Sequence, residues 1–364
     1  MKILFCAGGT FGHVAPALAA ADALKKKAPD TEILFAGREN GAENKTIRKA
    51  GYTLYEIPMQ SIGRRLNIQT LRAALTTIQA LGKAKNILRQ IKPDIVFGTG
   101  GYVCYPILRA AQALGIPTAL HESNATAGRA CRMLAPKCRI VLLGTRGCEK
   151  SLPANTPWKF TGNPVREEFF LYTKEKARRI LGLPSNARLI FSFGGSGGAQ
   201  CLNDAILSFM AKRDIGQNIY HVHAVGKKYY EEAAARYPAF TARNSKNRIF
   251  PFIENMPLYM CAADLCICRS GAMTVAELAA AKLPAILVPS PNVTENHQHK
   301  NAQSLVDIGG AVLLEEKNLG KLGDAIAEIL SDEARRTSMQ ESLMRCREKE
   351  AADQISASIL SILP

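Results

Sequence analysis

Two glycine-rich segments, one in each half of the chain, follow the same pattern and constrain the fold more than any other feature. Residues 3–7 and 189–193 are apolar runs typical of buried strands, and each is followed by a glycine-rich turn, Gly8–Gly12 and Gly194–Gly198. The sequence after each turn has helical periodicity. A strand, a turn of exposed amides and a helix N-terminus form an anion site in α/β proteins. The repeat therefore predicts two nucleotide-scale α/β domains that face one another across a cleft.

The rest of the chain alternates between predicted strands and helices in two blocks. We expect strands at residues 32–36, 94–97, 117–120 and 139–143, then at 188–193, 219–225, 247–251, 264–268, 285–288 and 311–314. Expected helices of the first half lie near residues 41–50, 67–90, 104–114 and 125–134. A chain of 364 residues exceeds the usual size of one hydrophobic core. The pattern predicts two doubly wound parallel sheets, over residues 1–162 and 163–345, with a helix at about 346–364 that packs back on the first domain.

The positive charge is concentrated in the first half. Residues 1–162 carry 23 Lys and Arg against 9 Asp and Glu, whereas residues 163–364 carry 24 against 22. This excess of positive charge favours an anionic partner: a nucleic acid, an acidic membrane surface or a polyanionic substrate. A contribution to solubility alone would also explain the charge. The chain has no zinc-finger spacing or RNA-recognition signature, which disfavours nucleic acid.

Cysteine spacing and hydropathy exclude other classes of protein. The ten cysteines include no Cys-x-x-Cys pair, so we expect reduced thiols in a cytosolic protein and neither a metal site nor a disulfide framework. The apolar run before Gly8 is too short for a signal peptide. No apolar run approaches the roughly 20 residues of a membrane span, so any membrane contact is expected to be peripheral.

Several polar residues follow predicted strands, where open α/β sheets bind ligands. His13 at a helix start is a candidate general base, although a helix cap or a packed imidazole fits the same position. Glu122 is a second candidate base, and Ser196 is a hydroxyl donor suited to a diphosphate. Glu277, about one turn into a helix, can accept both hydroxyls of a ribose, although a solvated glutamate fits equally.

Two further segments carry hydrogen-bonding groups. The run from Glu295 to Asn301 suits a sugar ring with several hydroxyls. Its His297-x-His299 pair has no supporting cluster of metal ligands. Arg166, beside the expected hinge at Gly162 and Pro164, can reach a diphosphate.

Taken together, these motifs resemble the MurG family of bacterial N-acetylglucosaminyltransferases over nearly the whole chain. The resemblance rests on the first glycine loop and on the motifs at residues 100–103, 121–124, 162–166, 194–199, 252–253 and 268–274. It implies a GT-B fold, with the donor UDP-GlcNAc held mainly by the C-terminal domain. Phe11 stands where the family usually has glycine, and Gly197 replaces a larger residue.

The resemblance also implies roles for individual residues. Ile253 reads uracil through its backbone, Glu277 binds the ribose and Gln298 contacts the sugar hydroxyls. The remaining implied donor contacts are Ser196, Ala272, Met273, Thr274, Val275 and Ala276 in the C-terminal half, with Thr10, Phe11, Gly12, Asn124 and Arg166 completing the site. His13 is the expected catalytic base, with Glu122 as the second candidate.

The implied reaction is an inverting transfer to the 4-hydroxyl of undecaprenyl-diphospho-MurNAc-pentapeptide, a step of peptidoglycan synthesis. It implies no metal or other cofactor, in keeping with the lack of an Asp-x-Asp motif. The protein is expected at the cytoplasmic face of the bacterial inner membrane. An apolar stripe in residues 62–90, flanked by basic residues that include Arg64 and Arg65, is a candidate docking surface, although ordinary core packing explains the stripe equally well. Alternatives are a UDP-GlcNAc 2-epimerase, a glycolipid glycosyltransferase, or a basic nucleotide- or nucleic-acid-binding protein without activity.

Overall fold

The computed structural model describes residues 1–41, 43–59, 68–212, 218–243 and 245–363. The chain forms two compact units. Unit 1 comprises Met1–Val165 and Glu348–Pro364, and unit 2 comprises Arg166–Arg347. Both units belong to the α/β class, and each is built around one parallel sheet. No described helix has the length and apolar character needed to cross a membrane.

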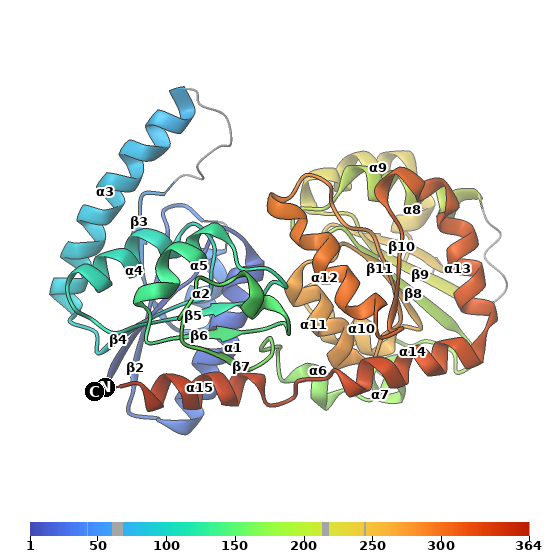
Figure 1. The fold of residues 1–364 in the computed structure, drawn as a ribbon. Coiled ribbons are helices and arrows are strands. Elements are labelled where there is room, and N and C mark those ends of the chain that lie inside the picture. Colours follow the sequence, from blue (N-terminus) through green and yellow to red (C-terminus); the bar gives the residue numbers. More distant parts are fainter. Residues whose placement is uncertain (42, 60–67, 213–217, 244, 364) are drawn as a thin grey trace. The chain divides into compact units, whose positions relative to one another are not determined.

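Unit 1 alternates strands and helices along the chain (Figure 1). Its strands are β1 (Lys2–Cys6), β2 (Glu32–Arg38), β3 (Thr53–Ile57), β4 (Ile95–Gly98), β5 (Thr118–Glu122), β6 (Ile140–Leu143) and β7 (Trp158–Phe160). Its helices are α1 (Phe11–Lys27), α2 (Asn44–Lys49), α3 (Ile68–Ile91), α4 (Cys104–Ala113), α5 (Arg129–Leu134) and α15 (Ala351–Ser361), with 3-10 turns η1 (Ala135–Lys137) and η2 (Cys148–Ser151).

The unit 1 sheet is parallel, in the order β3-β2-β1-β4-β5-β6-β7. Strand β1 lies inside it, and its apolar residues are fully buried on both faces. Ile3 and Phe5 pack on the side covered by α1 and α15, whereas Leu4 and Cys6 pack toward α3, α4 and α5. This two-sided burial explains why β1 reads as a continuous apolar run.

Helix α15 completes the core of unit 1 although it lies more than 300 residues from α1 in the sequence. Ile355 and Ile359 are fully buried against α1. The Ser356 hydroxyl donates to the Ala20 carbonyl at 3.3 Å, and Lys27 pairs with Asp353 at 3.1 Å. These contacts attach the C-terminal helix to the first unit.

Unit 2 repeats the alternation. Its strands are β8 (Arg188–Phe193), β9 (Ile219–Ala224), β10 (Asn247–Phe250), β11 (Leu265–Cys268), β12 (Ala285–Leu287) and β13 (Ala311–Leu313). Its helices are α6 (Glu168–Leu171), α7 (Lys174–Ile180), α8 (Gln200–Lys212), α9 (Tyr230–Arg236), α10 (Met256–Ala262), α11 (Ala272–Ala281), α12 (His297–Val306), α13 (Leu322–Ser331) and α14 (Glu333–Arg345). Its 3-10 turns are η3 (Lys227–Tyr229), η4 (Pro238–Thr241), η5 (Thr294–Asn296) and η6 (Glu316–Lys321).

The unit 2 sheet is also parallel, in the order β10-β9-β8-β11-β12-β13. Because all strands run in one direction, the loops after β8, β10, β11 and β12 emerge at the same carboxyl edge. That edge is where open α/β sheets bind ligands.

Two strands of unit 1 were not predicted from the sequence. Strand β3 is an edge strand with a mixed burial pattern, and β7 is an edge strand of three residues, of which Trp158 is 48% exposed. Neither shows the apolar run of an inner parallel strand. Helix α5 begins at Arg129, four residues later than the helix expected at residue 125.

Candidate functional site

The first glycine loop joins β1 to α1 and packs on the loop that follows β4. Gly9 has φ +90°, and a side chain there would meet the ring of Tyr102 at 2.9 Å. Its amide donates to the Oε1 atom of the buried Glu43 at 2.6 Å. One amide of the predicted anion cradle therefore already binds a carboxylate of the protein itself.

His13 lies in the first turn of α1, and its ring is held in one tautomer. Its Nδ1 atom is 3.0 Å from the Thr99 carbonyl oxygen, and that oxygen can only accept. In the neutral ring the proton is therefore on Nδ1 and the lone pair is on Nε2. A substituent on Gly101 would meet the ring at 2.9 Å, so the β4–α4 loop fixes the ring orientation as well. An imidazole in this form can accept a proton at Nε2.

Glu122 ends β5 with both oxygens engaged. Oε1 accepts from the amide and the side chain of Asn124 at 3.0 and 2.9 Å, and Oε2 accepts from the Gly128 amide at 2.9 Å. The carboxylate is 3% exposed. This geometry shapes the loop that carries Asn124 and leads into α5.

His121, which precedes Glu122, is buried and lies 3.1 Å from the Gly162 carbonyl. Burial lowers the pKa of His121 to about 4, so the ring is neutral at physiological pH. This histidine is a structural part of the β5 end.

In unit 2 the second glycine loop joins β8 to α8, and packing requires glycine at two of its positions, Gly194 and Gly198. A side chain on Gly194 would lie 2.5 Å from the Ala199 amide, and one on Gly198, which has φ +75°, would lie 2.3 Å from the Val225 carbonyl. Ser196 lies exposed at the tip of this loop. Gly197 has open space around it, so the family departure at this position creates no conflict.

Helix α11 begins directly after β11 at the same carboxyl edge. The first bond within the helix runs from the Val275 amide to the Gly271 carbonyl at 3.0 Å. The amides of residues 272–274 precede that bond and are the donors that a helix N-terminus offers an anion. Ala272 and Met273 are buried, while Thr274, Val275 and Ala276 are half-buried.

Glu277 lies in the second turn of α11, and Arg166 is near enough to affect it. Burial raises the pKa of Glu277 to about 7, and the guanidinium charge of Arg166 opposes that rise. Arg166 donates to the Glu254 carbonyl at 3.3 Å, close to the buried Ile253. The sequence-predicted residues Ile253, Arg166 and Glu277 therefore belong to one neighbourhood of unit 2.

A polar pocket of about 580 Å³ lies at this edge. Gly194, Gly198, Ala199, Gln200, Cys201, Asp204, Arg269, Ser290, Asn292, Gln298 and Glu316 line it. The Gln298 Oε1 atom accepts from the Ser290 amide at 2.9 Å, which leaves the amide NH₂ to donate to a ligand. Gln298 is thus held in place by its own loop.

Sequence reasoning missed an ion pair among the residues that line this pocket. Arg269 directly follows β11, is 9% exposed and pairs with Glu316 at 2.5 Å. It also donates to the carbonyls of Val288 and Pro289 at 3.1 Å each. Its place directly after an inner strand was the available signal, but Glu316 lies 47 residues further along the chain.

No cluster of three or more His, Cys, Asp or Glu side chains suited to a metal ion occurs in the described part of the chain. His299 of the His297-x-His299 pair instead contacts Glu315 at 3.2 Å.

Comparisons with known proteins agree across both units. Residues 3–143 match the glycosyltransferase family 28 N-terminal domain, and residues 189–355 match the glycosyltransferase family 28 C-terminal domain. The chain is 36% identical to the UDP-N-acetylglucosamine--N-acetylmuramyl-(pentapeptide) pyrophosphoryl-undecaprenol N-acetylglucosamine transferase of Acetivibrio thermocellus, over 100% of this chain and 98% of the relative. The enzyme of the same name from Lactococcus lactis is 36% identical over 98% of both chains.

Solved structures are similar to this chain over nearly its whole length as well. The crystal structure of Acinetobacter baumannii MurG aligns over 99% of both chains, with a TM-score of 0.75 and 27% identity. UDP-GlcNAc 2-epimerase from Neisseria meningitidis aligns over 99% of this chain and 100% of its own, with a TM-score of 0.67 and 14% identity. The second likeness shows the shared fold only.

Proposed function

Because the chain belongs to the MurG family within glycosyltransferase family 28, we propose that it transfers GlcNAc from UDP-GlcNAc to undecaprenyl-diphospho-MurNAc-pentapeptide in peptidoglycan synthesis. One observation carries the proposal beyond family membership: the second glycine loop and helix α11, which carries Glu277 in its second turn, both follow strands at the same carboxyl edge of unit 2. We call the residues Ser196, Ile253, 272–277 and Gln298 the donor edge.

The donor edge offers a group for each part of a nucleotide sugar. The Glu277 carboxylate can accept both ribose hydroxyls, and the amides of residues 272–274 can donate to the diphosphate. Ser196 adds a hydroxyl donor, the Gln298 amide can donate to a sugar hydroxyl, and the Ile253 backbone can pair with the uracil. Arg166 supplies a positive charge near the ribose site.

Catalysis in this proposal needs a base in unit 1 and charge stabilisation in unit 2. The acceptor 4-hydroxyl attacks the anomeric carbon, the bond from that carbon to the diphosphate oxygen breaks, and configuration inverts. His13 Nε2 takes the hydroxyl proton, a role supported by the tautomer that the Thr99 carbonyl fixes. The α11 amides and Ser196 stabilise the negative charge that develops on UDP.

Glu122 and the first glycine loop receive supporting roles. With both oxygens accepting from Asn124 and Gly128, Glu122 is better suited to position the Asn124 loop than to take a proton. Thr10, Phe11, Gly12 and Asn124 remain proposed contacts to the substrates. Because the α11 amides and Ser196 supply the charge stabilisation, the proposed mechanism requires no metal ion or other cofactor.

We also propose that the protein binds the cytoplasmic face of the bacterial inner membrane peripherally, because the acceptor is a lipid. The excess of basic residues in the first half supports this localisation and suits an anionic lipid surface. Within α3, Ile78 is 65% exposed, and Lys83 and Lys85 are also exposed. Arg64 and Arg65 of the predicted docking surface lie outside the described residues.

A transfer assay tests the function directly. Purified protein, radiolabelled UDP-GlcNAc and a lipid-linked muramoyl acceptor should give a labelled lipid-linked disaccharide, and EDTA-treated protein should give the same rate. A 2-epimerase would convert the donor without acceptor, and a binding protein would leave it unchanged. Either result refutes the proposal.

A further inference from the structure

Unit 2 contains a second pocket, of about 650 Å³, away from the donor edge. It lies among α6, the start of α7, the end of α10, the end of α11, and α14. Helix α11 begins at the donor edge with Ala272 and reaches this pocket with Ala280 and Ala281. The ten residues of α11 span about 15 Å, so the donor edge and this pocket lie at opposite ends of the helix. The second pocket is therefore separate from the proposed nucleotide site.

Arg347 presents a guanidinium group to this pocket without a matching acceptor. Its Nε atom is buried and has no hydrogen-bond partner among the described residues. The guanidinium carbon lies 4.5 Å from the centre of the Phe170 ring. Burial lowers the pKa of Arg347. A buried N–H group of a cation that has no partner carries a free-energy cost, and an anionic ligand would remove it.

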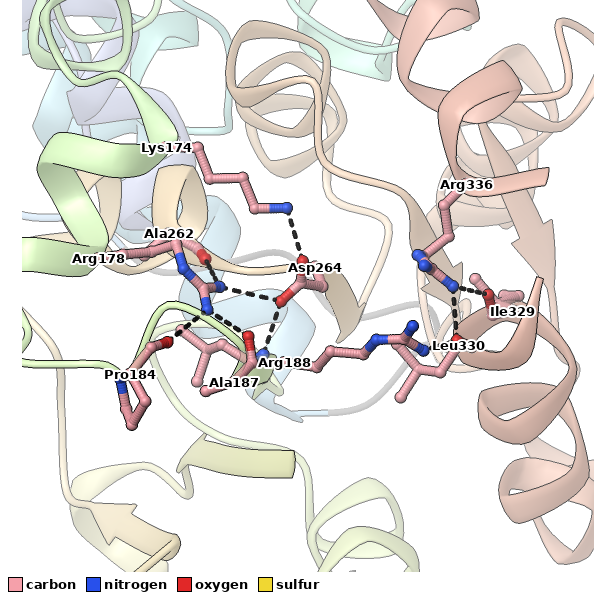
Figure 2. Close-up of polar contacts among 11 residues, drawn as sticks. Lys174, Arg178, Pro184, Ala187, Arg188, Ala262, Asp264, Ile329, Leu330 and Arg336 are labelled. Carbon is pink, nitrogen blue, oxygen red and sulfur yellow. Dashed lines mark hydrogen bonds and ion pairs between the residues drawn. The ribbon is translucent and has the colours of Figure 1, made fainter. Parts of the chain in front are cut away.

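Two other guanidinium groups of unit 2, those of Arg336 and Arg178, are satisfied within the protein (Figure 2). Arg336, on the same helix α14, donates to the Ile329 carbonyl at 3.0 Å and to the Leu330 carbonyl. Arg178 donates to carbonyls at the end of α10 and in the loop before β8, and pairs with Asp264 at 3.2 Å. In contrast to Arg336 and Arg178, Arg347 has an Nε–H group without a partner among the described residues, so its guanidinium can bind an acceptor from outside the chain.

The other groups around the pocket suit an amphipathic anion. Cys261, Ala280, Ala281 and Met344 give it an apolar side, and Met344 is 60% exposed at its rim. Burial raises the pKa of Cys261 to about 11, and the charges of Arg347 and Lys282 oppose that rise, so both cations lie near this thiol.

Neither carboxylate that lines the pocket neutralises Arg347. Glu175 bonds its own backbone amide and the Thr173 side chain, which lowers its pKa. The Glu341 carboxylate lies 4.0 Å from the guanidinium of Arg345, a residue that does not line the pocket.

We propose that this pocket is a second ligand site, for a small amphipathic anion whose carboxylate or phosphate group binds the Arg347 guanidinium and whose flat apolar body lies against Ala280, Ala281 and Met344. The proposal does not depend on the transferase activity, because none of these residues belongs to the donor edge.

Calorimetry with phenyl phosphate, on the full-length protein saturated with UDP, tests this site. UDP occupies the donor edge and prevents the probe from binding there. We expect phenyl phosphate to bind at least tenfold more tightly than inorganic phosphate or phenol. Inorganic phosphate lacks the apolar ring, and phenol lacks the anionic group. Equal affinity for inorganic phosphate would refute the apolar part of the site, and equal affinity for phenol would refute the anionic part.

Two variants and one control complete the test. Arg347→Leu should weaken phenyl phosphate at least tenfold, and Ala281→Phe, which fills the apolar side, should do the same. Arg345→Leu, two residues earlier and largely exposed, should leave the affinity unchanged. Circular dichroism melting verifies that each variant is folded. A crystal structure with the phosphate group away from Arg347, or an unchanged affinity in a folded Arg347→Leu protein, would overturn the proposal.

Discussion

Glu277 offers the sharpest test, because the feature that suits it to bind a ribose also destabilises the unliganded protein. Its pKa lies at about 7 instead of the ordinary 4.5, and burial is the main cause. At 1.36 kcal/mol per pH unit, this difference corresponds to about 3 kcal/mol of unfolding free energy. The unfolded chain releases the proton near pH 4.5, whereas the folded chain retains it up to about pH 7. The free energy of unfolding therefore falls between these two values, and the full cost is present above pH 7.

Glu277→Gln removes this titration and keeps the shape of the side chain. The unfolding free energy of the variant relative to the wild type should rise by about 3 kcal/mol between pH 4 and pH 8. Urea unfolding followed by circular dichroism, without nucleotide, measures the difference at each pH. A difference that stays constant across this range would show that the carboxyl group is not destabilised by burial.

The same titration predicts how the protein binds uridine, a probe without titrating phosphates. The carboxylate form accepts both ribose hydroxyls, so affinity should rise about tenfold from pH 6 to pH 8 as the ionised fraction grows. In Glu277→Gln the affinity should be lower at pH 8 and independent of pH over this range. A wild-type affinity that is flat with pH would refute the assignment of Glu277 to the ribose.

Three further predictions concern other residues. His13→Ala should lower turnover by roughly 10²–10⁴ in the transfer assay and leave the Kd for UDP unchanged, because His13 is proposed as a base and not as a nucleotide ligand; an unchanged turnover would refute the assignment. Gly198→Ala should destabilise unit 2 in urea unfolding, since its Cβ would lie 2.3 Å from the Val225 carbonyl, whereas Gly197→Ala has open space and should cost about 1 kcal/mol or less; equal effects would contradict the packing argument. His221 and His223 are buried around Ser192, and burial lowers the pKa of both, that of His223 to about 4. Unit 2 therefore loses stability as the pH falls from 6.5 toward 4, because the unfolded chain binds these protons before the folded chain does. Between pH 7 and pH 4.5 the melting temperature should fall less in His223→Asn than in the wild type, and an identical fall would argue against this origin.

The sequence predicted the features that depend on local pattern. The inner strands β1 and β8 are apolar on both faces, and the glycine turns after them mark the start of α1 and α8, so these elements were predicted within a few residues. Strands β3 and β7 were missed because they lack that signal: β3 has a mixed burial pattern, and Trp158 of the three-residue β7 is 48% exposed. The two doubly wound parallel sheets followed from the inner strands, whereas the GT-B fold was implied by the family resemblance.

Contacts between distant residues could not be read from the sequence. The Gly9 amide binds Glu43, 34 residues away, and so the first loop differs from a simple anion cradle. Glu122 was a candidate base from its place at the end of a strand, but three N–H groups of its own loop occupy its oxygens. The unbonded Nε of Arg347 is likewise visible only when the pocket around it is formed.

A crystal structure with bound UDP-GlcNAc would show whether the donor edge holds the nucleotide sugar. We expect both ribose hydroxyls on the Glu277 carboxylate, the diphosphate on the amides of residues 272–274, and the sugar beside Gln298. A donor bound elsewhere on unit 2, with these groups unoccupied, would contradict this expectation.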